Sequence, residues 1–558
     1  MNWTQVYDPF GLWPVSTLAA ALPVALLFYL LAVRGTRPHK AAFAGAVAAI
    51  AVACLVFTMP LGTSLASFFF GVAFGLKIAW IVIAAVFLYD IAVATGQFEI
   101  MKDSVAAISE DRRLQAVLIA FAFGAFIEGC AGFGAPVAIS GAFMIGLGFD
   151  PFYAATLNLI ANTAPVAWGS IGTPLHTLAA VTGLPLASLS AMTGRILPLT
   201  SIIVPIWLVR VMVPWRQTLE VLPAILVCGV SFAITQFLWS NFVDSNLVDI
   251  ASAVVCLISM LTFLRFWQPK NIYRFKSDAV SDASAVKRHP GRTVFRAWLP
   301  FLILTLFVLM WGLPPIKNTM NQWTTPSFAV KLADGTARPG PAGWDVPWLH
   351  NRVLRDRPVV EKPTAEAARY DFNWLTATGT AVFLAAVVSA FLLGLSQWEI
   401  VKLLLKTVYR MRFGVLAIVS MLGLGFVTRY SGMDAVLGLA FTRTGWLFPF
   451  FGTFLGWLGV ALTGSDTSSN ALFGSLQRIT AEQLGLNPIL MASANSAGGV
   501  MGKMVDAQSI VVATAATNQV GSEGKILRSV AWHSVTLAAI VGIIVMLFAY
   551  VFPWAIPK

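Results

Sequence analysis

Charged residues are scarce in this sequence of 558 residues. Asp, Glu, Lys and Arg make up 11% of it, whereas hydrophobic residues make up 58% and the mean hydropathy is +0.78. A soluble domain of this size needs more polar surface, so the composition predicts a protein that crosses a membrane many times. The formal net charge of +12 is then explained by basic loops on one side of a membrane, and not by binding to nucleic acid.

Cysteine and histidine are also few. The four cysteines lie in apolar stretches at unrelated spacings, which argues against a disulfide framework and against a zinc site. The five histidines are scattered, and the sequence has no HExxH motif, no nucleophile elbow and no phosphate-binding Gly-rich loop. We therefore expect neither an enzyme nor an ATP-driven pump, and we expect no metal and no cofactor.

Long apolar runs predict the membrane spans. Ten segments have the roughly 20 apolar residues that a span needs, namely 15–33, 41–60, 66–94, 189–212, 219–239, 248–266, 297–313, 374–394, 412–430 and 530–553. Two further regions, 114–183 and 446–518, are apolar but interrupted by Gly, Pro, Asn and charged residues. The predicted fold class is an all-α polytopic membrane protein with about 12 spans and two re-entrant hairpins.

The distribution of basic residues predicts the orientation. The loops 34–40 and 267–296 are basic, as is the stretch 398–412, which we expect to form an amphipathic interfacial helix. We place these three segments in the cytoplasm. The loop 240–247 has no basic residue and faces outside, and parity places the long segment 314–373 and both termini outside as well.

The two interrupted regions resemble each other. The segment "LGFDPFYAATLN", from Leu147, aligns without gaps with "LGLNPILMASAN", which begins 337 positions later at Leu484. At the same offset "EGCAGFGAP" falls opposite "SDTSSNALF", and both break an apolar run. Because the charge rule gives the two halves opposite directions, this pattern predicts an inverted repeat with discontinuous helices, as in secondary transporters.

These patterns divide the chain into repeated parts. Irregular backbone at membrane depth is tolerated only around a polar cavity, so the two hairpin tips are expected to meet near the bilayer centre. The predicted parts are scaffold helices of the first repeat (1–96), its hairpin and broken helix (97–183), connecting helices (184–313), an extracytoplasmic loop (314–373), scaffold helices of the second repeat (374–430), its hairpin and broken helix (431–518), and a C-terminal helix (519–558).

The broken segments also resemble a known family. "EGCAGFGAPVAI", "NTAPVAWG", "TGSDTSSNALFGSLQ" and "NSAGGVMGK" are similar to signatures of the lactate permease family, and the likeness covers essentially the whole chain. The resemblance implies a multi-pass protein of the bacterial inner membrane, with paired hairpins and inverted repeats. It further implies symport of lactate, glycolate or a related short 2-hydroxymonocarboxylate with protons. Asp506 and His176 depart from the family pattern.

The resemblance and the chain breaks together define the candidate site. Lys503 is our preferred cation for the substrate carboxylate, alongside the N-termini of half-helices. The candidate substrate-binding residues are Gly129, Cys130, Gly132, Phe133, Gly134, Asn162, Thr163, Ser465, Thr467, Ser468, Ser469, Asn470, Asn495, Gly499, Lys503 and Gln508. The candidate proton-coupling residues are Glu128, Asp466, Asp506 and His176.

Each of these residues has a structural alternative. Asp466 could cap the helix that restarts at Asn470, Glu128 could bond to N–H groups of its hairpin, and Lys503 could pair with Asp506. The hydroxyl groups could simply satisfy broken backbone. A sodium-coupled carboxylate transporter on the same scaffold is the alternative function. The expected partners are the substrate, protons and the lipid bilayer, and a homo-oligomer is compatible with the sequence.

Overall fold

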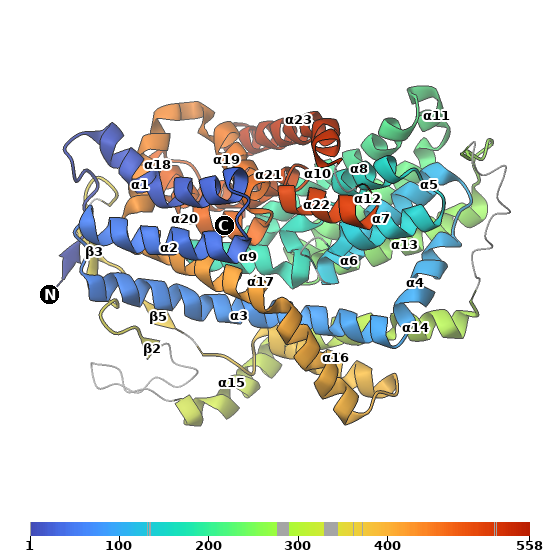
Figure 1. The fold of residues 1–558 in the computed structure, drawn as a ribbon, viewed down its shortest axis with the longest axis horizontal. Helices are drawn as coiled ribbons and strands as arrows, with labels where there is room; N and C mark the ends of the chain where they lie inside the picture. Colours follow the sequence, from blue (N-terminus) through green and yellow to red (C-terminus); the bar gives the residue numbers. More distant parts are fainter. Residues whose placement is uncertain are drawn as a thin grey trace.

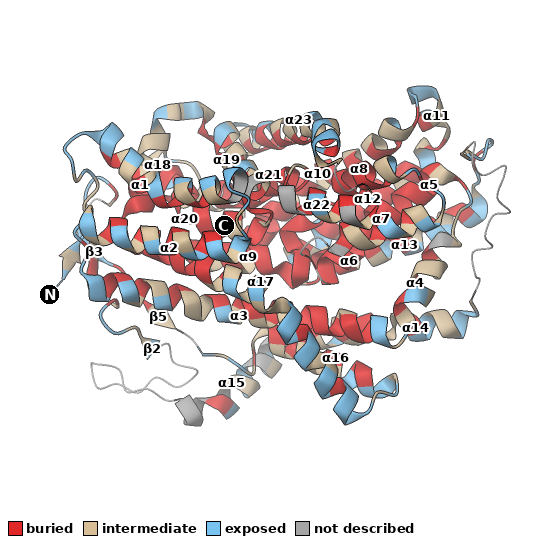
Figure 2. Ribbon diagram, viewed as in Figure 1, coloured by how far each residue is buried: buried red, intermediate tan, exposed pale blue. Residues whose placement is uncertain are grey.

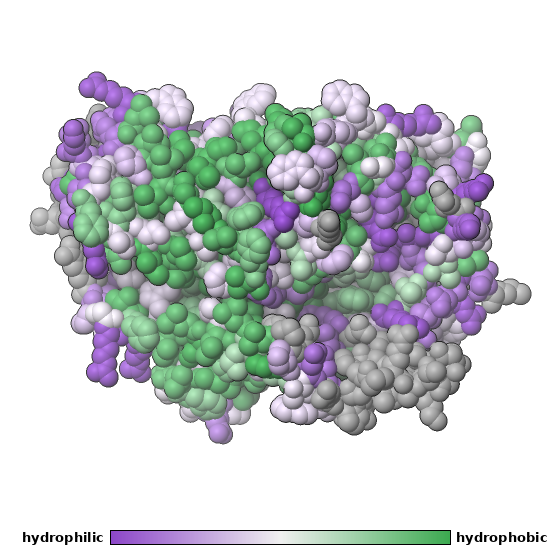
Figure 3. Space-filling model, turned by 180° about the vertical axis from the view of Figure 1, so that it is seen from behind, coloured by the Kyte–Doolittle hydropathy of each residue, from purple (hydrophilic) through white to green (hydrophobic). Residues whose placement is uncertain are grey.

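The computed structural model describes residues 2–130, 132, 135–275, 289–328, 344–360, 362–370, 372–517, 519 and 522–557. Ten helical stretches in these ranges are long and apolar enough to cross a membrane. In Figure 3, hydrophobic residues cover the area left of the centre and the lower left of the face, and hydrophilic residues gather at the left edge and over much of the right half. The prediction of an all-α polytopic membrane protein is confirmed, apart from a few two- and three-residue strands.

The first repeat runs from α1 to α10 (Figure 1). Its outer helices are α1 (Trp13–Phe28), α2 (Pro38–Leu55), α3 (Leu61–Ala94) and α4 (Gln97–Ala106). Hairpin 1 follows, with α5 (Arg112–Ala116), the π-helical turns η2 (Val117–Phe123), α6 (Gly124–Cys130) and α7 (Ala135–Gly146). A broken helix comes next, formed by α8 (Pro151–Ala161), η3 (Val166–Trp168) and α9 (Gly169–Thr182), and then α10 (Leu186–Met212).

From α2 onward, the second repeat has the same order of elements. The helices α14 (Gly291–Gly312) and α15 (Pro314–Phe328) precede it. Its frame helices are α16 (Thr378–Leu392) and α17 (Gln397–Ser431), followed by α18 (Met433–Phe441) and η5 (Thr442–Leu447). Hairpin 2 consists of α19 (Phe448–Thr463) and α20 (Asp466–Gln483), and α21 (Pro488–Gly502), α22 (Ala507–Ala516) and α23 (Glu523–Tyr550) complete the repeat. The sequence offset holds for whole helices, since α3 and α17 end 337 positions apart, at Ala94 and Ser431, and so do Pro151 and Pro488 at the starts of α8 and α21. The predicted repeat is confirmed.

The helices α3 and α17 show that the repeat is inverted. Phe70, near the start of α3, packs against Tyr430, near the end of α17, with ring centroids 6.3 Å apart. At the other end of the pair, Arg410 Nη2 donates to Asp90 Oδ1 at 2.7 Å. The two helices are therefore antiparallel, as the charge rule predicted. Each is continuous, with 34 and 35 residues. The stretch 398–412, predicted to form an amphipathic interfacial helix, is helical and forms the first part of α17.

Backbone contact joins α3 to α17. A Cβ atom placed on Gly71 would lie 2.4 Å from the carbonyl oxygen of Leu422. Glycine at this position therefore lets the two helices approach more closely than any side chain would allow, as is common in membrane interfaces. The pair forms the frame against which the hairpins lie.

Short strands gather at one end of the molecule, at the left in Figure 1. Strand β1 (Trp3–Thr4) pairs in parallel with β3 (Val353–Arg355), β3 pairs antiparallel with β4 (Thr364–Ala365), and β2 (Trp344–Asp345) pairs antiparallel with β5 (Arg369–Tyr370). We call this the strand end. The described part of the predicted extracytoplasmic loop 314–373 thus includes the helix α15 and the strands β2 to β5.

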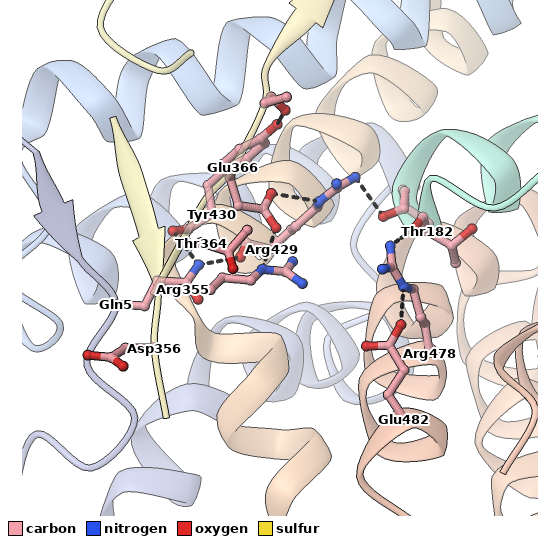
Figure 4. A network of polar contacts seen from close by, with 12 residues as sticks. Gln5, Thr182, Arg355, Asp356, Thr364, Glu366, Arg429, Tyr430, Arg478 and Glu482 are labelled. Atoms are coloured by element: carbon pink, nitrogen blue, oxygen red, sulfur yellow. Dashed lines mark hydrogen bonds and ion pairs between the residues drawn. The ribbon is translucent and has the colours of Figure 1, made fainter. Parts of the chain in front are cut away.

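Two half-buried arginines contact the end of the broken helix of the first repeat, and one of them links it to the strand end (Figure 4). Arg429 of α17 forms an ion pair with Glu366 at 3.5 Å and donates through Nη1 to the carbonyl oxygen of Val181 at 2.9 Å. Arg478 of α20 donates to the carbonyl oxygen of Thr182. The C-terminal carbonyls of α9 thereby receive cationic donors from both the frame and hairpin 2.

An additional helical pair lies between the two repeats. It consists of α12 (Leu222–Phe242) and α13 (Val248–Phe266), preceded by the short α11 (Trp215–Glu220), and α13 packs against α6 of hairpin 1. Figure 2 shows that buried residues concentrate in the middle of the molecule, around α6, α9 and α21. The candidate site lies in this buried region.

Candidate functional site

A small polar cavity lies where the two hairpin tips meet, as the sequence predicted. Its volume is about 30 Å³. It is lined by Glu128 and Gly132 from hairpin 1, by Val166, Gly169, Ser170, Thr173 and Pro174 from the broken helix of the first repeat, by Gly464, Ser465, Asp466 and Thr467 from hairpin 2, and by Lys503. Backbone breaks of both repeats therefore surround one buried space.

Asp466 lies at the tip of hairpin 2. Its Oδ2 atom accepts hydrogen bonds from Ser496 Oγ at 2.5 Å and from Asn470 Nδ2 at 3.3 Å. The helix α20 starts at Asp466 rather than at Asn470, and its N-cap is Ser465, whose hydroxyl accepts from the amide of Ser468. The capping alternative for Asp466 is therefore wrong, because the neighbouring serine has taken that role and the carboxylate points toward α21.

A glycine makes room for the other oxygen of this carboxylate. A Cβ atom placed on Gly499 would lie 2.2 Å from Asp466 Oδ1, which has no hydrogen-bond partner among the described residues. Gly499 and Ser496 lie on the same face of α21, so one helix face both bonds and accommodates Asp466. The position of the carboxylate depends on that face.

Lys503 lies at the end of α21, with 4% of its surface exposed. Its Nζ atom donates to the carbonyl oxygen of Gly464 at 2.5 Å and lies 3.5 Å from Asp506 Oδ2. Asp506 is the N-cap of α22 and accepts from the amide of Ser509 at 2.6 Å. The predicted Lys503–Asp506 pair is present, and it bridges the break between two helices. Lys503 is the only basic residue that lines the cavity within the described part of the chain.

Glu128 faces the cavity from the last turn of α6. It is 4% exposed, and its Oε2 atom has no hydrogen-bond partner among the described residues. A Cβ atom on Gly169 would lie 2.5 Å from Glu128 Oε1, so the carboxyl group packs directly against the backbone that starts α9. The carboxyl group thus packs against backbone on one side and leaves one oxygen without a donor among the described residues.

The start of α9, which lies beside Glu128, has an unusual backbone conformation. Ser170, Ile171 and Gly172 all have left-handed conformations, with φ values of 46°, 59° and 73°. This conformation is costly for a β-branched residue such as Ile171 and is concentrated at functional sites. The turn gives α9 its break beside the cavity.

Several predicted residues hold the hairpins together and do not line the cavity. Ser469 donates to the carbonyl oxygen of Gly456, Asn470 to that of Pro174, and Asn495 to Asn470 Oδ1. In the first repeat, Thr163 donates to the carbonyl oxygen of Ile160, and Asn162 ends α8 with a buried amide that has no partner among the described residues. Gly129 and Cys130 are buried in the last turn of α6, where Gly129 faces α13. These side chains thus join backbone segments of the hairpins, whereas Ser465 and Thr467 of the same tip line the cavity.

His176 lies in a different place. Its Nε2 atom is 2.6 Å from Asn246 Oδ1, and it lines a second cavity of about 500 Å³ between the 240–246 segment and the ends of α14 and α16. We call this cavity the vestibule. Phe133 and Gly134 lie outside the described residues, as does the side chain of Gln508.

Sequence reasoning missed two buried polar residues at the tips. Ser496, Gly499 and Lys503 recur at helical spacing, and this face of "NSAGGVMGK" could have identified Ser496 as the partner of Asp466. Asp249 of α13 is fully buried beside Gly129. Its signal was a single acid at the start of a predicted span, which resembles an ordinary first-turn helix residue.

The fold and the site together define the class of the protein. Inverted repeats whose broken helices meet at a buried polar cavity are characteristic of secondary transporters. The chain belongs to the L-lactate permease family, whose sequence profile matches residues 16–552. No enzyme motif accompanies this match, and the family name denotes a transporter.

Relatives agree in length as well as in sequence. The chain is 44% identical to the glycolate permease GlcA of Escherichia coli strain K12, over 99% of both chains. It is 43% identical to the L-lactate permease of Bacillus subtilis strain 168, over 100% of both chains. The solved YdaH transporter of Alcanivorax borkumensis is similar over 86% of both chains, with 14% identity and a TM-score of 0.40, a score too low to define the fold of this chain.

Proposed function

We propose that this protein imports lactate, glycolate or a related short 2-hydroxymonocarboxylate across the bacterial inner membrane by symport with protons. The cavity between the two tips carries the proposal, because it places one lysine beside the carboxyl groups of Glu128 and Asp466. The names of the relatives, which are lactate and glycolate permeases, support the choice of substrate.

The charges at the cavity favour a proton as the coupling ion. Lys503 is accompanied by Glu128, Asp466 and Asp506, all nearly or fully buried. If all three acids were ionised, a substrate anion would enter a site that already carries net negative charge, which is costly in a buried setting. Protonation of an acid removes that cost, so the anion and the proton favour each other's binding.

The small size of the cavity requires a conformational change. A volume of about 30 Å³ accommodates about two water molecules, and lactate is several times larger than a water molecule. The tips must therefore separate to admit substrate. We propose that the hairpins and broken helices move as a unit against the frame of α3 and α17, in the manner of an elevator. The ranges predicted from the sequence for the hairpins with their broken helices, 97–183 and 431–518, are the proposed moving units. We place the strand end and both termini outside the cytoplasm.

Purified protein in proteoliposomes tests the coupling ion. We expect lactate to accumulate when the outside is more acidic than the inside, in buffers that contain potassium and no sodium. The same vesicles with a sodium gradient and no pH gradient serve as the control. Accumulation that needs sodium and ignores the pH gradient would favour the alternative, a sodium-coupled carboxylate carrier whose hydroxyl-rich tips bind the ion.

Competition tests the substrate class. A single lysine suits a monocarboxylate, whereas a dicarboxylate would need more cationic or N–H capacity at the site. We expect unlabelled glycolate to compete with labelled lactate, and succinate at the same concentration to leave uptake unchanged. Strong competition by succinate would contradict the monocarboxylate assignment.

A further inference from the structure

Asp249 is a buried acid for which the proposed cycle has not yet given a role. It lies in the first turn of α13, its surface is 0% exposed, and neither carboxyl oxygen has a hydrogen-bond partner among the described residues. Buried polar groups normally have partners, so an exception in a transporter is a candidate for function.

The position of Asp249 connects it to hairpin 1. A Cβ atom placed on Gly129 would lie 3.0 Å from the Cβ atom of Asp249, so α13 rests directly on the tip of the hairpin. The titratable groups that face Asp249 from α6 are Glu128 and Cys130. Within the described residues no lysine, arginine or histidine forms an ion pair with it.

The absence of a partner decides which form of Asp249 is stable. An ionised carboxylate with neither a donor nor a counter-charge in a buried site is strongly unfavourable. Asp244, five residues earlier, shows the contrast, since it accepts from the amide and the side chain of Asn246 at 2.6 and 2.7 Å. Asp249 therefore holds a proton at rest, and it can release that proton only to a neighbouring base.

The vestibule gives this proton a source. Asn246 lines the vestibule and contacts His176 at 2.6 Å, and it lies three residues before Asp249 in the chain. The left-handed turn of α9 separates the vestibule from the cavity, because a Cβ atom on Gly172 would lie 2.7 Å from the carbonyl oxygen of Ser245. Asp249 thus follows the segment that lines the vestibule and packs against Gly129, the residue next to Glu128.

We propose that Asp249 is a second proton-carrying carboxyl group, which takes a proton from the vestibule and passes it to Glu128. The step breaks one O–H bond on Asp249 and forms one on Glu128, with no transfer of electrons. The vestibule water then restores the proton on Asp249. This inference rests on the proposed proton symport and adds a residue to it that belongs to neither repeat.

Two kinds of uptake separate this role from a structural one. In proteoliposomes of the full chain, exchange of internal for external lactate requires no net proton movement, whereas accumulation driven by a pH gradient does. We expect Asp249→Asn to keep lactate exchange within about twofold of wild type and to lower pH-driven accumulation by about tenfold or more. Asp434→Asn is the matched control, because Asp434 is also a buried acid in the first turn of a helix, away from both tips.

Carbodiimide labelling provides a direct measurement on the unmodified protein. A hydrophobic carbodiimide reacts with protonated carboxyl groups in apolar surroundings, and mass spectrometry of the labelled chain locates the site. We expect label on Asp249 that decreases as the pH is raised, and partial recovery of accumulation in Asp249→Glu. If Asp249→Asn does not fold, the labelling and the Asp249→Glu variant still decide the question.

The outcomes are distinct. Wild-type protein that fails to accumulate lactate under a pH gradient would overturn the proposed symport itself. Wild-type protein that accumulates lactate, together with an Asp249→Asn variant that does so with the same pH dependence, would overturn only the role of Asp249. Label confined to other carboxyl groups would do the same.

Discussion

The two hairpin tips occupy corresponding places in the inverted repeat but are built differently. At the tip of hairpin 2, Asp466 is bonded to Ser496 and Asn470, and the helix that follows is 18 residues long. At the tip of hairpin 1, Glu128 Oε1 lies close to the backbone of Gly169, and the following helix α7 is 12 residues long. Each acid leaves one oxygen without a partner among the described residues, Asp466 Oδ1 and Glu128 Oε2. The difference lies in the other oxygen, which receives two side-chain donors in Asp466 and packs against backbone in Glu128.

This difference indicates a division of labour. Donors stabilise the ionised form of a carboxylate, and burial without donors stabilises its neutral form. We therefore expect the two donors of Asp466 to fix its position at the proposed substrate site. We expect Glu128 to be the acid that gains and loses the proton. The inverted repeat has two similar hairpins, and the acids at their tips have different surroundings.

Removing the shared cation tests the comparison most severely. We expect Lys503→Ala to lower lactate uptake by about a hundredfold or more, since the substrate anion would face three carboxyl groups alone. Lys402→Ala, on an exposed position of α17, is the control. The variant leaves the buried carboxyl group of Asp506 without its partner, which could destabilise the fold. Thermal unfolding of the detergent-solubilised variant measures this effect. Uptake like that of wild type would remove Lys503 from the site.

Neutralising each acid separately tests the division of labour. We expect Glu128→Gln to lower pH-driven accumulation by about tenfold or more, while lactate exchange continues. Asp466→Asn retains an acceptor for Ser496, so we expect it to weaken substrate affinity while accumulation still depends on the pH gradient. The two assays are run side by side in vesicles. The reverse pattern, with coupling lost only in Asp466→Asn, would exchange the two roles.

Crowding each acid gives a smaller and more graded effect. In Gly499→Ala the new methyl group would press on Asp466, which is tethered by Ser496, and we expect uptake to fall by about tenfold. In Gly169→Ala the methyl group meets Glu128 Oε1, the end of a longer side chain with fewer bonds to lose, so we expect a fall of about threefold. Equal losses at both glycines would show that the two tips are equally rigid.

The smallest effect concerns one hydroxyl group. Ser496→Ala removes the donor at 2.5 Å from Asp466, and we expect an increase of about threefold in the KM for lactate with little change in maximal rate. Ser493→Ala is the control, because its hydroxyl group donates to Leu189 on α10 instead. A change in the pH dependence of uptake in Ser496→Ala would indicate that Asp466 itself titrates during transport.

Much of the fold could be predicted because membranes impose strict rules. Interruptions in apolar runs identified both hairpins and both broken helices, and the charge of the loops identified the inversion. The sequence could not predict which of two neighbouring side chains would cap a helix. Ser465 and Asp466 are both good N-caps by type, and only the packing of α21 decides that the serine caps the helix.

Contacts between distant segments were also beyond the sequence. Asp249 lies 120 positions after Gly129, its neighbour in hairpin 1, and belongs to neither repeat, so no internal alignment marks it. Its burial depends on how α13 rests on Gly129, which is a tertiary property. His176 was grouped with the site because of its sequence neighbours, and the structure places it at the vestibule.

The close approach at Gly71 has a mechanical consequence. A contact between a backbone and a carbonyl group has no side-chain rotamers with which to adjust, so α3 and α17 cannot slide past each other without a collision at Leu422. The contact at Gly71 therefore fixes the two antiparallel helices to each other. In the proposed movement of the hairpins, a force exerted on one of these helices is transmitted to the other, so that α3 and α17 stay fixed as one body.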